Sequence, residues 1–300
     1  MRKWVLALAV LVAAGLVAWR LCTPGPPPLA PVDGSNGEIE VWASSGALAD
    51  LATRILGPAH PVRRVVLANG LPPREDLVAM QRARIVIGLG PEAGDVWMGL
   101  VGLPAAARVE LAEGAWGESL VAREGVISHR HGPTGAHTHV EREPCPWVEP
   151  RRGRELIDHV RAELARRGLG PRAPSPETTS LELELQRLAA RLDAIAGVEL
   201  LASHGAYRYL ATRPGWSVEV AGVETSVPPT DTALAAFEVV RTRRPGARIL
   251  LVAGPPHAGW VDALARADVA CAIVPLDGDG RYFDGLALAL DDLARRLESR

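Results

Sequence analysis

One stretch of the sequence, residues 128–150, concentrates side chains that bind metals. It contains four of the eight histidines and one of the three cysteines: His129, His131, His137, His139 and Cys145. Neutral imidazole and thiolate are ligands that zinc and other borderline-soft metals prefer. A solvated polar loop is the alternative interpretation, but two His-x-His pairs followed by a cysteine favour contact with a metal.

The two cysteines of the main body differ in their surroundings. Cys145 lies between Pro144 and Pro146, and prolines on both sides indicate an irregular segment rather than a core strand or helix, although a lone thiol is often a small buried hydrophobe. Cys271 lies in the apolar run 269–274, which predicts a buried strand. We therefore expect Cys145 to be free of a disulfide.

Apolar runs alternate with amphipathic segments through the first half of the chain. The expected order is a strand at 39–43, a helix capped by Ser44 or Ser45 that ends near Leu56, a strand at 62–67, a helix at 74–83, a strand at 85–87, a short helix at 95–101 and a strand at 107–111. Wholly apolar strands such as 85–87 predict a parallel sheet covered by helices on both faces. The long loop with the histidines follows, and loops of this length are usually functional.

The same alternation returns after a helical middle section. A helix at 151–167 precedes a second one at 176–196, which has Ser175 as its cap and Pro176 at its first position. Then come a strand at 198–202, a helix from Ala206, a strand at 218–221, a helix at 229–243, a strand at 248–253, a helix at 259–267, the strand with Cys271 and a helix at 286–297. The predicted fold class is α/β, with two lobes, each a parallel sheet flanked by helices, joined by a long helix. A cleft between such lobes is the usual place for a ligand.

Composition changes along the chain divide it into regions. We expect a signal or membrane anchor at 1–22, a Pro-rich tether at 23–37, an N-terminal α/β lobe at 38–150 with a His-rich loop at 128–142, a helical connector at 151–197 and a C-terminal α/β lobe at 198–300.

The N-terminal segment is typical of an export signal. Met1-Arg2-Lys3 is followed by an apolar run from Trp4 to Trp19, and this run spans roughly 24 Å as a helix, short of a bilayer core of about 30 Å. Cleavage, retention as an anchor and lipidation at Cys22 all remain open, and retention is favoured over lipidation because no small residue precedes Cys22. We expect the body beyond Gly37 to lie in the periplasm or otherwise outside the cytoplasm, tethered to the membrane.

Charge and composition exclude several classes of function. Lys3 is the only lysine, so the body lacks the residue that a Walker-type phosphate loop and a Schiff-base enzyme both need. The net charge is −2 and the arginines are spread along the chain, so we expect no nucleic-acid partner.

Three segments resemble the zinc- and manganese-binding solute receptors of bacterial ABC importers, and the likeness runs from about Ile39 to the C-terminus. Residues 198–210 end in Ser-His-Gly-Ala-Tyr-Arg-Tyr-Leu and are similar to the family's strand followed by Ser-His-Gly-Ala-aromatic. Residues 143–150, Glu-Pro-Cys-Pro-Trp-Val-Glu-Pro, are similar to its Asp-Pro-His-x-Trp-x-Asp-Pro. Residues 274–277, Val-Pro-Leu-Asp, are similar to the strand end that carries its metal-binding Asp.

The resemblance implies a metal site and its partners. It assigns His204, Asp277 and Cys145 as ligands, with Cys145 in place of a histidine. The His-rich loop is similar to the zinc branch, so zinc is expected ahead of manganese. An ABC importer permease is the implied partner, and we expect a monomeric receptor that delivers metal to it and catalyses no reaction.

One ligand of the family has no counterpart here. The family's first histidine follows its second strand, whereas residues 67–73 of this chain are shorter and contain no histidine. Zinc takes four donors in structural and receptor sites, and His139 is only six residues from Cys145. We therefore expect His139 or His137 to complete the site, with water as the alternative fourth ligand.

Other interpretations of these residues stay open. His204 could cap the next helix, Asp277 could belong to an ordinary turn, and Glu224 is an acidic candidate that the pattern does not place. A degenerate receptor without metal would act as a membrane-tethered interaction module. Cys145, His204 and Asp277 are also the residue types of a thiol-hydrolase triad, but Pro144 and Pro146 remove backbone donors beside the thiol.

Overall fold

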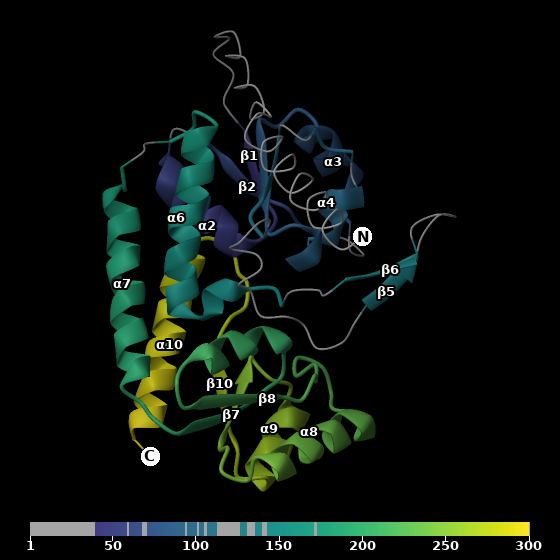
Figure 1. The fold of residues 1–300 in the computed structure, drawn as a ribbon. Coiled ribbons are helices and arrows are strands. Elements are labelled where there is room, and N and C mark those ends of the chain that lie inside the picture. The colour runs from purple at the N-terminus through teal and green to yellow at the C-terminus, as the bar shows by residue number, and fades with distance from the viewer. Residues whose placement is uncertain are drawn as a thin grey trace, which may run out of the picture. The chain divides into compact units, whose positions relative to one another are not determined.

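The computed structural model places two parallel β-sheets in the body of the chain (Figure 1). It describes residues 40–58, 60–67, 71–93, 95–100, 102–104, 107–112, 127–130, 136–139, 143–170 and 173–299. The expected anchor and tether at 1–37 lie outside the described residues. Among the described helices, none combines the length and the apolar character that a membrane span needs.

The first sheet has the strand order β2-β1-β3-β4, all parallel. Its strands are β1 (Val41–Ala43), β2 (Val62–Arg64), β3 (Ile85–Gly88) and β4 (Arg108–Glu110), and the helices between them are α2 (Gly46–Leu56), α3 (Arg74–Met80), the single-turn η1 (Pro91–Ala93) and α4 (Val96–Leu100). β1 and β3 are buried throughout, as their apolar sequences predict. β2 lies at the edge and ends earlier than predicted, because its partner β1 ends at Ala43.

The second sheet has the order β10-β9-β7-β8 and is also parallel. It contains β7 (Val198–Ala202), β8 (Trp216–Val220), β9 (Ile249–Val252) and β10 (Ala270–Ile273), with η3 (Gly205–Thr212), α8 (Asp231–Arg243) and α9 (Ala258–Arg266) between them. Two predictions need correction. The helix after β7 is a 3₁₀ helix. The strand with Cys271 is not buried, because β10 lies at the edge of the sheet and exposes Ile273.

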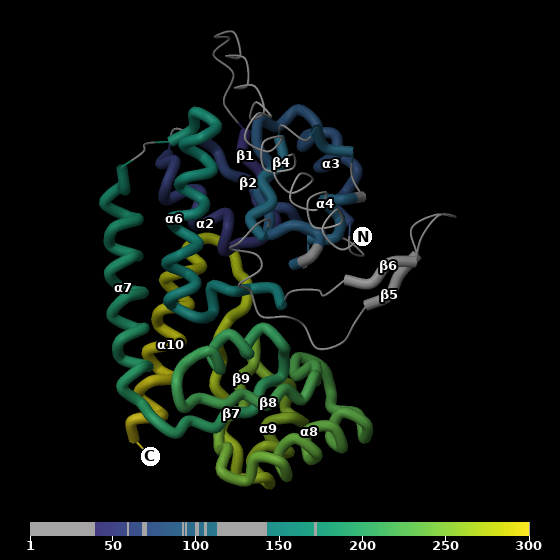
Figure 2. The backbone as a smooth tube through the Cα atoms, in the orientation of Figure 1, coloured from purple at the N-terminus to yellow at the C-terminus, as the bar shows by residue number. Residues whose placement is uncertain are grey.

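Three longer helices connect and cover the sheets: α6 (Pro150–Arg166), α7 (Pro176–Asp193) and α10 (Tyr282–Glu298). α7 begins as predicted, since the Ser175 side chain accepts a hydrogen bond from the Thr178 amide at 3.1 Å. α7 packs against both α6 and α10, and α10 also contacts α2 (Figures 1 and 2). The helices thereby link the elements of both sheets.

The hydrophobic core is continuous through these helices. One cluster of buried side chains contains Val41 of β1, Leu185 of α7, Leu200 of β7 and Leu286 of α10. A smaller cluster around Trp260 fills the space between the second sheet and α8 and α9. The predicted architecture of two parallel sheets with flanking helices is confirmed.

The His-rich segment contains more regular structure than predicted. β5 (Ile127–Arg130) and β6 (Ala136–His139) form an antiparallel pair, in which His129 is in register with His137 and Ile127 with His139. Its polar sequence lacks the apolar alternation by which half-buried strands are recognised, so the sequence alone predicts a loop. Residues 131–135 and 140–142 lie outside the described residues.

Candidate functional site

Side-chain hydrogen bonds join the segment of Cys145 to the segment of Asp277. The indole Nε1 of Trp147, in the 3₁₀ turn η2 (Pro146–Val148), donates to the Leu276 carbonyl at 2.9 Å. Trp147 also packs edge-to-face against Tyr282, with ring centroids 6.4 Å apart. Two segments that are 129 residues apart in the sequence therefore meet in the buried interior.

The segment that follows His204 joins both of them. The Tyr207 hydroxyl donates to the Val274 carbonyl at 2.6 Å, and the Tyr209 hydroxyl donates to the Glu143 carbonyl at 2.7 Å. The Arg208 guanidinium donates to the buried Glu143 carboxylate at 2.8 Å. All three segments singled out in the sequence thus converge at the ends of strands β7 and β10.

Cys145 has an unusual backbone and a protonated thiol. It precedes η2 in the left-handed region, with φ of 63°, a conformation that costs non-glycine residues about 1–3 kcal/mol and is frequent at functional positions. It forms no disulfide with Cys271, as predicted for Cys145. Burial raises the pKa of its thiol far above the ordinary value, and the nearby charges of Asp277, Asp95 and Glu143 raise it further.

Both carboxylate oxygens of Asp277 have a protein partner. Its Oδ1 accepts a hydrogen bond from the Gly46 amide at 2.7 Å, and its Oδ2 accepts one from Arg64 at 2.6 Å. The first contact satisfies one of the free amides at the start of α2. The approach is close, because a Cβ at position 46 would lie 1.5 Å from the Gly278 carbonyl oxygen.

His204 is exposed and caps η3. Its Nδ1 accepts a hydrogen bond from the Ala206 amide at 3.1 Å, so the capping role considered for this residue is present. Glu224 lies close enough to His204 for the two side chains to interact electrostatically. Hydrogen bonds from Ser226 lower the pKa of Glu224 below its ordinary value, and His204 adds a smaller decrease.

His137 and His139 lie on β6, for which the structure describes the backbone pairing with β5. Their side chains are outside the description, so their role as a fourth ligand stays a prediction.

No protein-family model matches the chain, and a search of curated proteins finds no relative. Solved structures do match. The metal-dependent lipoprotein YcdH from Bacillus subtilis aligns with a TM-score of 0.62 and 14% identity, over 86% of this chain and 98% of that one. The chain has the fold of these proteins.

Two streptococcal proteins share the same fold. The Zn(II)-bound ZnuA-like domain of AdcA from Streptococcus pneumoniae gives a TM-score of 0.61 at 12% identity, covering 86% of this chain and 98% of that one. The laminin-binding protein Lmb of Streptococcus agalactiae, described as having adhesin and metal-transporting activity, gives 0.63 at 14% identity, covering 86% and 99%. The resemblance inferred from the sequence is confirmed at the level of the fold.

The described side chains do not form a ready metal site. Among them, no three His, Cys, Asp or Glu residues are grouped so that they could hold a metal. Asp277 has a protein partner on each oxygen, and the Nδ1 of His204 is occupied by a backbone amide. A metal at Asp277 would therefore bind beside the Gly46 amide and the Arg64 guanidinium, or replace one of them.

Sequence reasoning missed Arg64 and Asp95. The Asp95 Oδ2 accepts hydrogen bonds from the Ser44 hydroxyl at 2.7 Å and the Leu89 amide at 2.6 Å, and burial raises the pKa of this carboxyl group. The only hint of Asp95 in the sequence was Gly88, the glycine that ends β3. Its missing side chain leaves room for the carboxylate, since a Cβ there would lie 2.7 Å from Asp95 Oδ2. Arg64 carried no signal at all, since arginines are common on exposed edge strands.

The geometry does not support a thiol hydrolase. A catalytic cysteine needs a lowered pKa so that the thiolate is present, whereas the pKa of Cys145 is raised. Asp277 binds Gly46 and Arg64, which is not the arrangement of a carboxylate that orients a histidine.

Proposed function

We propose that the chain is an extracytoplasmic zinc-binding solute receptor that delivers its metal to an ABC importer. The observation that supports this most is the convergence of the segments of Cys145, His204 and Asp277 through the hydrogen bonds of Trp147 and Tyr207. The shared fold with Zn(II)-bound and metal-dependent proteins adds to it.

The donors suit zinc as a transported ion. A thiolate, an imidazole and a carboxylate form a mixed set that zinc accepts in a tetrahedral site, and zinc brings no redox chemistry to the thiol. In this proposal Cys145, His204 and Asp277 provide three donors and His139 or His137 provides the fourth. Manganese is disfavoured, because it prefers oxygen ligands over a thiolate.

A second candidate is a receptor that has lost its metal. Arg64 supports it, because its guanidinium already neutralises the carboxylate that would face the ion. Such a protein would serve as a membrane-tethered interaction module.

Metal titration of the full chain separates the two. After removal of all metal, zinc and manganese are titrated in competition with a chelator of known affinity. We expect about one tightly bound zinc in the wild type and none in the double variant Cys145→Ser, His204→Ala. The matched control is Cys271→Ser, which removes the half-buried thiol of β10 and should leave the binding unchanged.

Each result has a clear meaning. A double variant that binds zinc like the wild type would refute this site, and a wild type that binds neither metal would support the degenerate receptor. A separate fusion tests the location: a reporter that is active only outside the cytoplasm, joined after Gly37, should be active, and an inactive reporter would contradict an extracytoplasmic body.

A further inference from the structure

The arginine at the end of β2 contacts the proposed ligand carboxylate directly. Arg64 Nη2 donates to Asp277 Oδ2 at 2.6 Å, and Nη1 binds the neighbouring Asp279. The other oxygen of Asp277 accepts the Gly46 amide at 2.7 Å. The guanidinium thus takes up the oxygen of Asp277 that the helix start leaves open.

This ion pair is only half-buried. The side chains of Arg64 and Asp277 keep 31% and 34% of their exposure, and the partner Asp279 keeps 88%. Water can therefore reach both groups and replace either partner when the pair opens, so separating them costs little free energy.

The surroundings leave room for the guanidinium to move. Arg64, Gly46 and Asp279 border an open groove of about 660 Å³, which is also lined by residues of α2 and by Glu177 at the start of α7. A side chain as long as arginine can swing into this groove and keep its charge in water. Asp277 would then retain the Gly46 amide on one oxygen and present the other.

We propose that Arg64 is an internal competitor of the metal: it holds Asp277 in the metal-free protein, and a divalent cation binds by displacing it. The inference rests on the proposed function, because it assumes that Asp277 is a ligand. Uptake is then an exchange of one cation for another at the same carboxylate. Its affinity is lowered by whatever free energy is needed to separate Arg64 from Asp277.

Zinc affinities of full-chain variants test the competition. Arg64→Gln removes the competitor and should tighten zinc binding by about two- to fivefold, the effect expected when breaking a half-exposed ion pair no longer opposes binding. Arg64→Lys keeps the positive charge but loses the forked pair of donors. Its zinc affinity should therefore lie between those of the wild type and Arg64→Gln. The matched control is Arg63→Gln on the same strand, because Arg63 pairs with Glu40 and lies over Trp42. It removes the same charge without touching Asp277.

A further variant shows whether the gain acts through the carboxylate. In Arg64→Gln combined with Asp277→Asn, the tighter binding should disappear. Thermal melting of the metal-free proteins provides a second measurement, since a purely structural clamp would lower the melting temperature of Arg64→Gln and leave its zinc affinity equal to that of Arg63→Gln. That pattern would overturn the inference.

The failures of the two proposals are distinguishable. If the wild type binds zinc and Arg64→Gln binds it no more tightly, the receptor stands and the competition is refuted. If only Arg64→Gln binds zinc, the competition is supported while the wild-type receptor function fails. If no variant binds zinc, both are refuted.

Discussion

Two arginines of this protein hold carboxylates in opposite ways. Arg213 has no exposed side-chain surface and binds Glu149, Asp193 Oδ1 at 2.6 Å and the Ala189 carbonyl at 3.0 Å. It joins the start of α6, the end of α7 and the end of η3. Arg64 binds Asp277 at 2.6 Å with about a third of its side chain exposed.

The comparison shows how burial decides what an ion pair can do. Breaking a buried pair leaves a charge without water or partner, so it costs much free energy. Breaking a half-exposed pair lets water replace the partner, so the net cost is small. Arg213 is therefore suited to fixing the helices, and Arg64 is suited to exchange.

The largest effect is expected for the buried arginine. Arg213→Met leaves the buried Glu149 carboxylate without its cationic partner and should lower the free energy of unfolding by about 3–5 kcal/mol, as measured by chemical denaturation. Combination with Glu149→Gln should restore part of the loss, because the amide oxygen can still accept the Arg152 amide that caps α6. A loss close to that of an exposed arginine would erase the distinction between Arg213 and Arg64.

A smaller change is expected at Asp277, the carboxylate that Arg64 binds. Asp277→Asn removes the charge of the proposed ligand and should weaken zinc binding by about tenfold or more, while the amide oxygen keeps the contact with the start of α2. Asp279→Asn is the matched control, because Asp279 shares Arg64 and is 88% exposed. We expect chelator competition to show little change for it. Equal weakening in both variants would mean that general charge, not ligation by Asp277, governs binding.

The pH dependence of zinc binding tests the role of Cys145 separately from that of Arg64. Burial holds the pKa of Cys145 above its ordinary value, so the thiol is protonated at neutral pH and zinc must release that proton. Zinc affinity should therefore rise with pH and fall as the pH falls, by about tenfold per pH unit for one proton. Calorimetry in buffers of different ionisation enthalpy should find about one proton released per zinc from Cys145.

The variant Cys145→His is the control for this slope. An imidazole is largely neutral at pH 7, so its proton release should shrink, whereas Arg64→Gln should keep the release of the wild type. A wild type that binds zinc without releasing a proton would show that Cys145 is not a ligand.

The sequence predicted local features better than contacts between distant ones. The apolar run 85–87 and the caps Ser45 and Ser175 act through neighbouring residues, and their strand and helices formed where expected. Cys145 and Asp277 were singled out by their motifs, and their role as ligands stays a prediction. Arg64 was missed, because its partner lies 213 residues away, beyond the end of a strand in the other sheet, and only tertiary packing brings the two together. The 3₁₀ geometry of η3 and the pairing of β5 with β6 left no clear periodic pattern.

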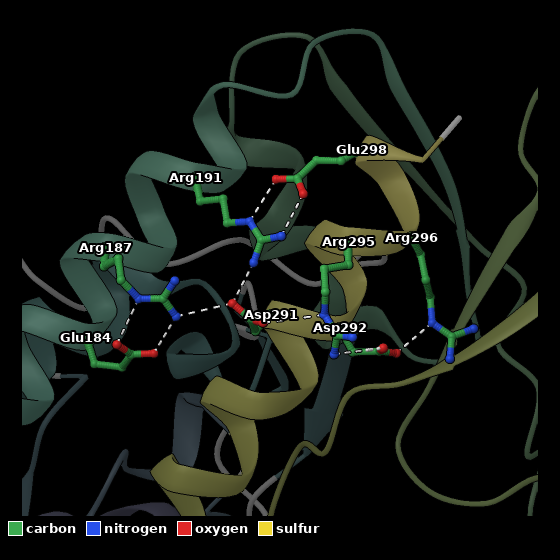
Figure 3. A network of polar contacts seen from close by, with 8 residues as sticks. All are labelled: Glu184, Arg187, Arg191, Asp291, Asp292, Arg295, Arg296 and Glu298. Carbon is green, nitrogen blue, oxygen red and sulfur yellow. Dashed lines mark hydrogen bonds and ion pairs between the residues drawn. The ribbon is translucent and has the colours of Figure 1, made fainter.

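The smallest effect is expected in a third setting, the partly exposed network between α7 and α10, where the side chains of Arg191 and Glu298 keep 24% and 43% of their exposure (Figure 3). Arg191 binds Asp291 at 2.5 Å and makes a forked contact with Glu298. Its hydrogen bonds hold the pKa of Glu298 below the ordinary value. A lowered carboxyl pKa stabilises the fold above the unfolded-state pKa, and this contribution is lost as the pH falls through the folded-state pKa.

Glu298→Gln should therefore lower the melting temperature by only about 2 °C or less at neutral pH, because exposed pairs contribute little. The difference from the wild type should shrink in high salt, which screens exposed charges, and should vanish in acid, where Glu298 is protonated in both states. Calorimetric scans at neutral pH with and without high salt, and at acidic pH, measure both trends. A loss of stability as large as that of Arg213→Met would contradict this expectation. It would show that the partly exposed network fixes α7 to α10 as firmly as the buried arginine fixes α6 to α7. Burial would then no longer explain the contrast between Arg213 and Arg64.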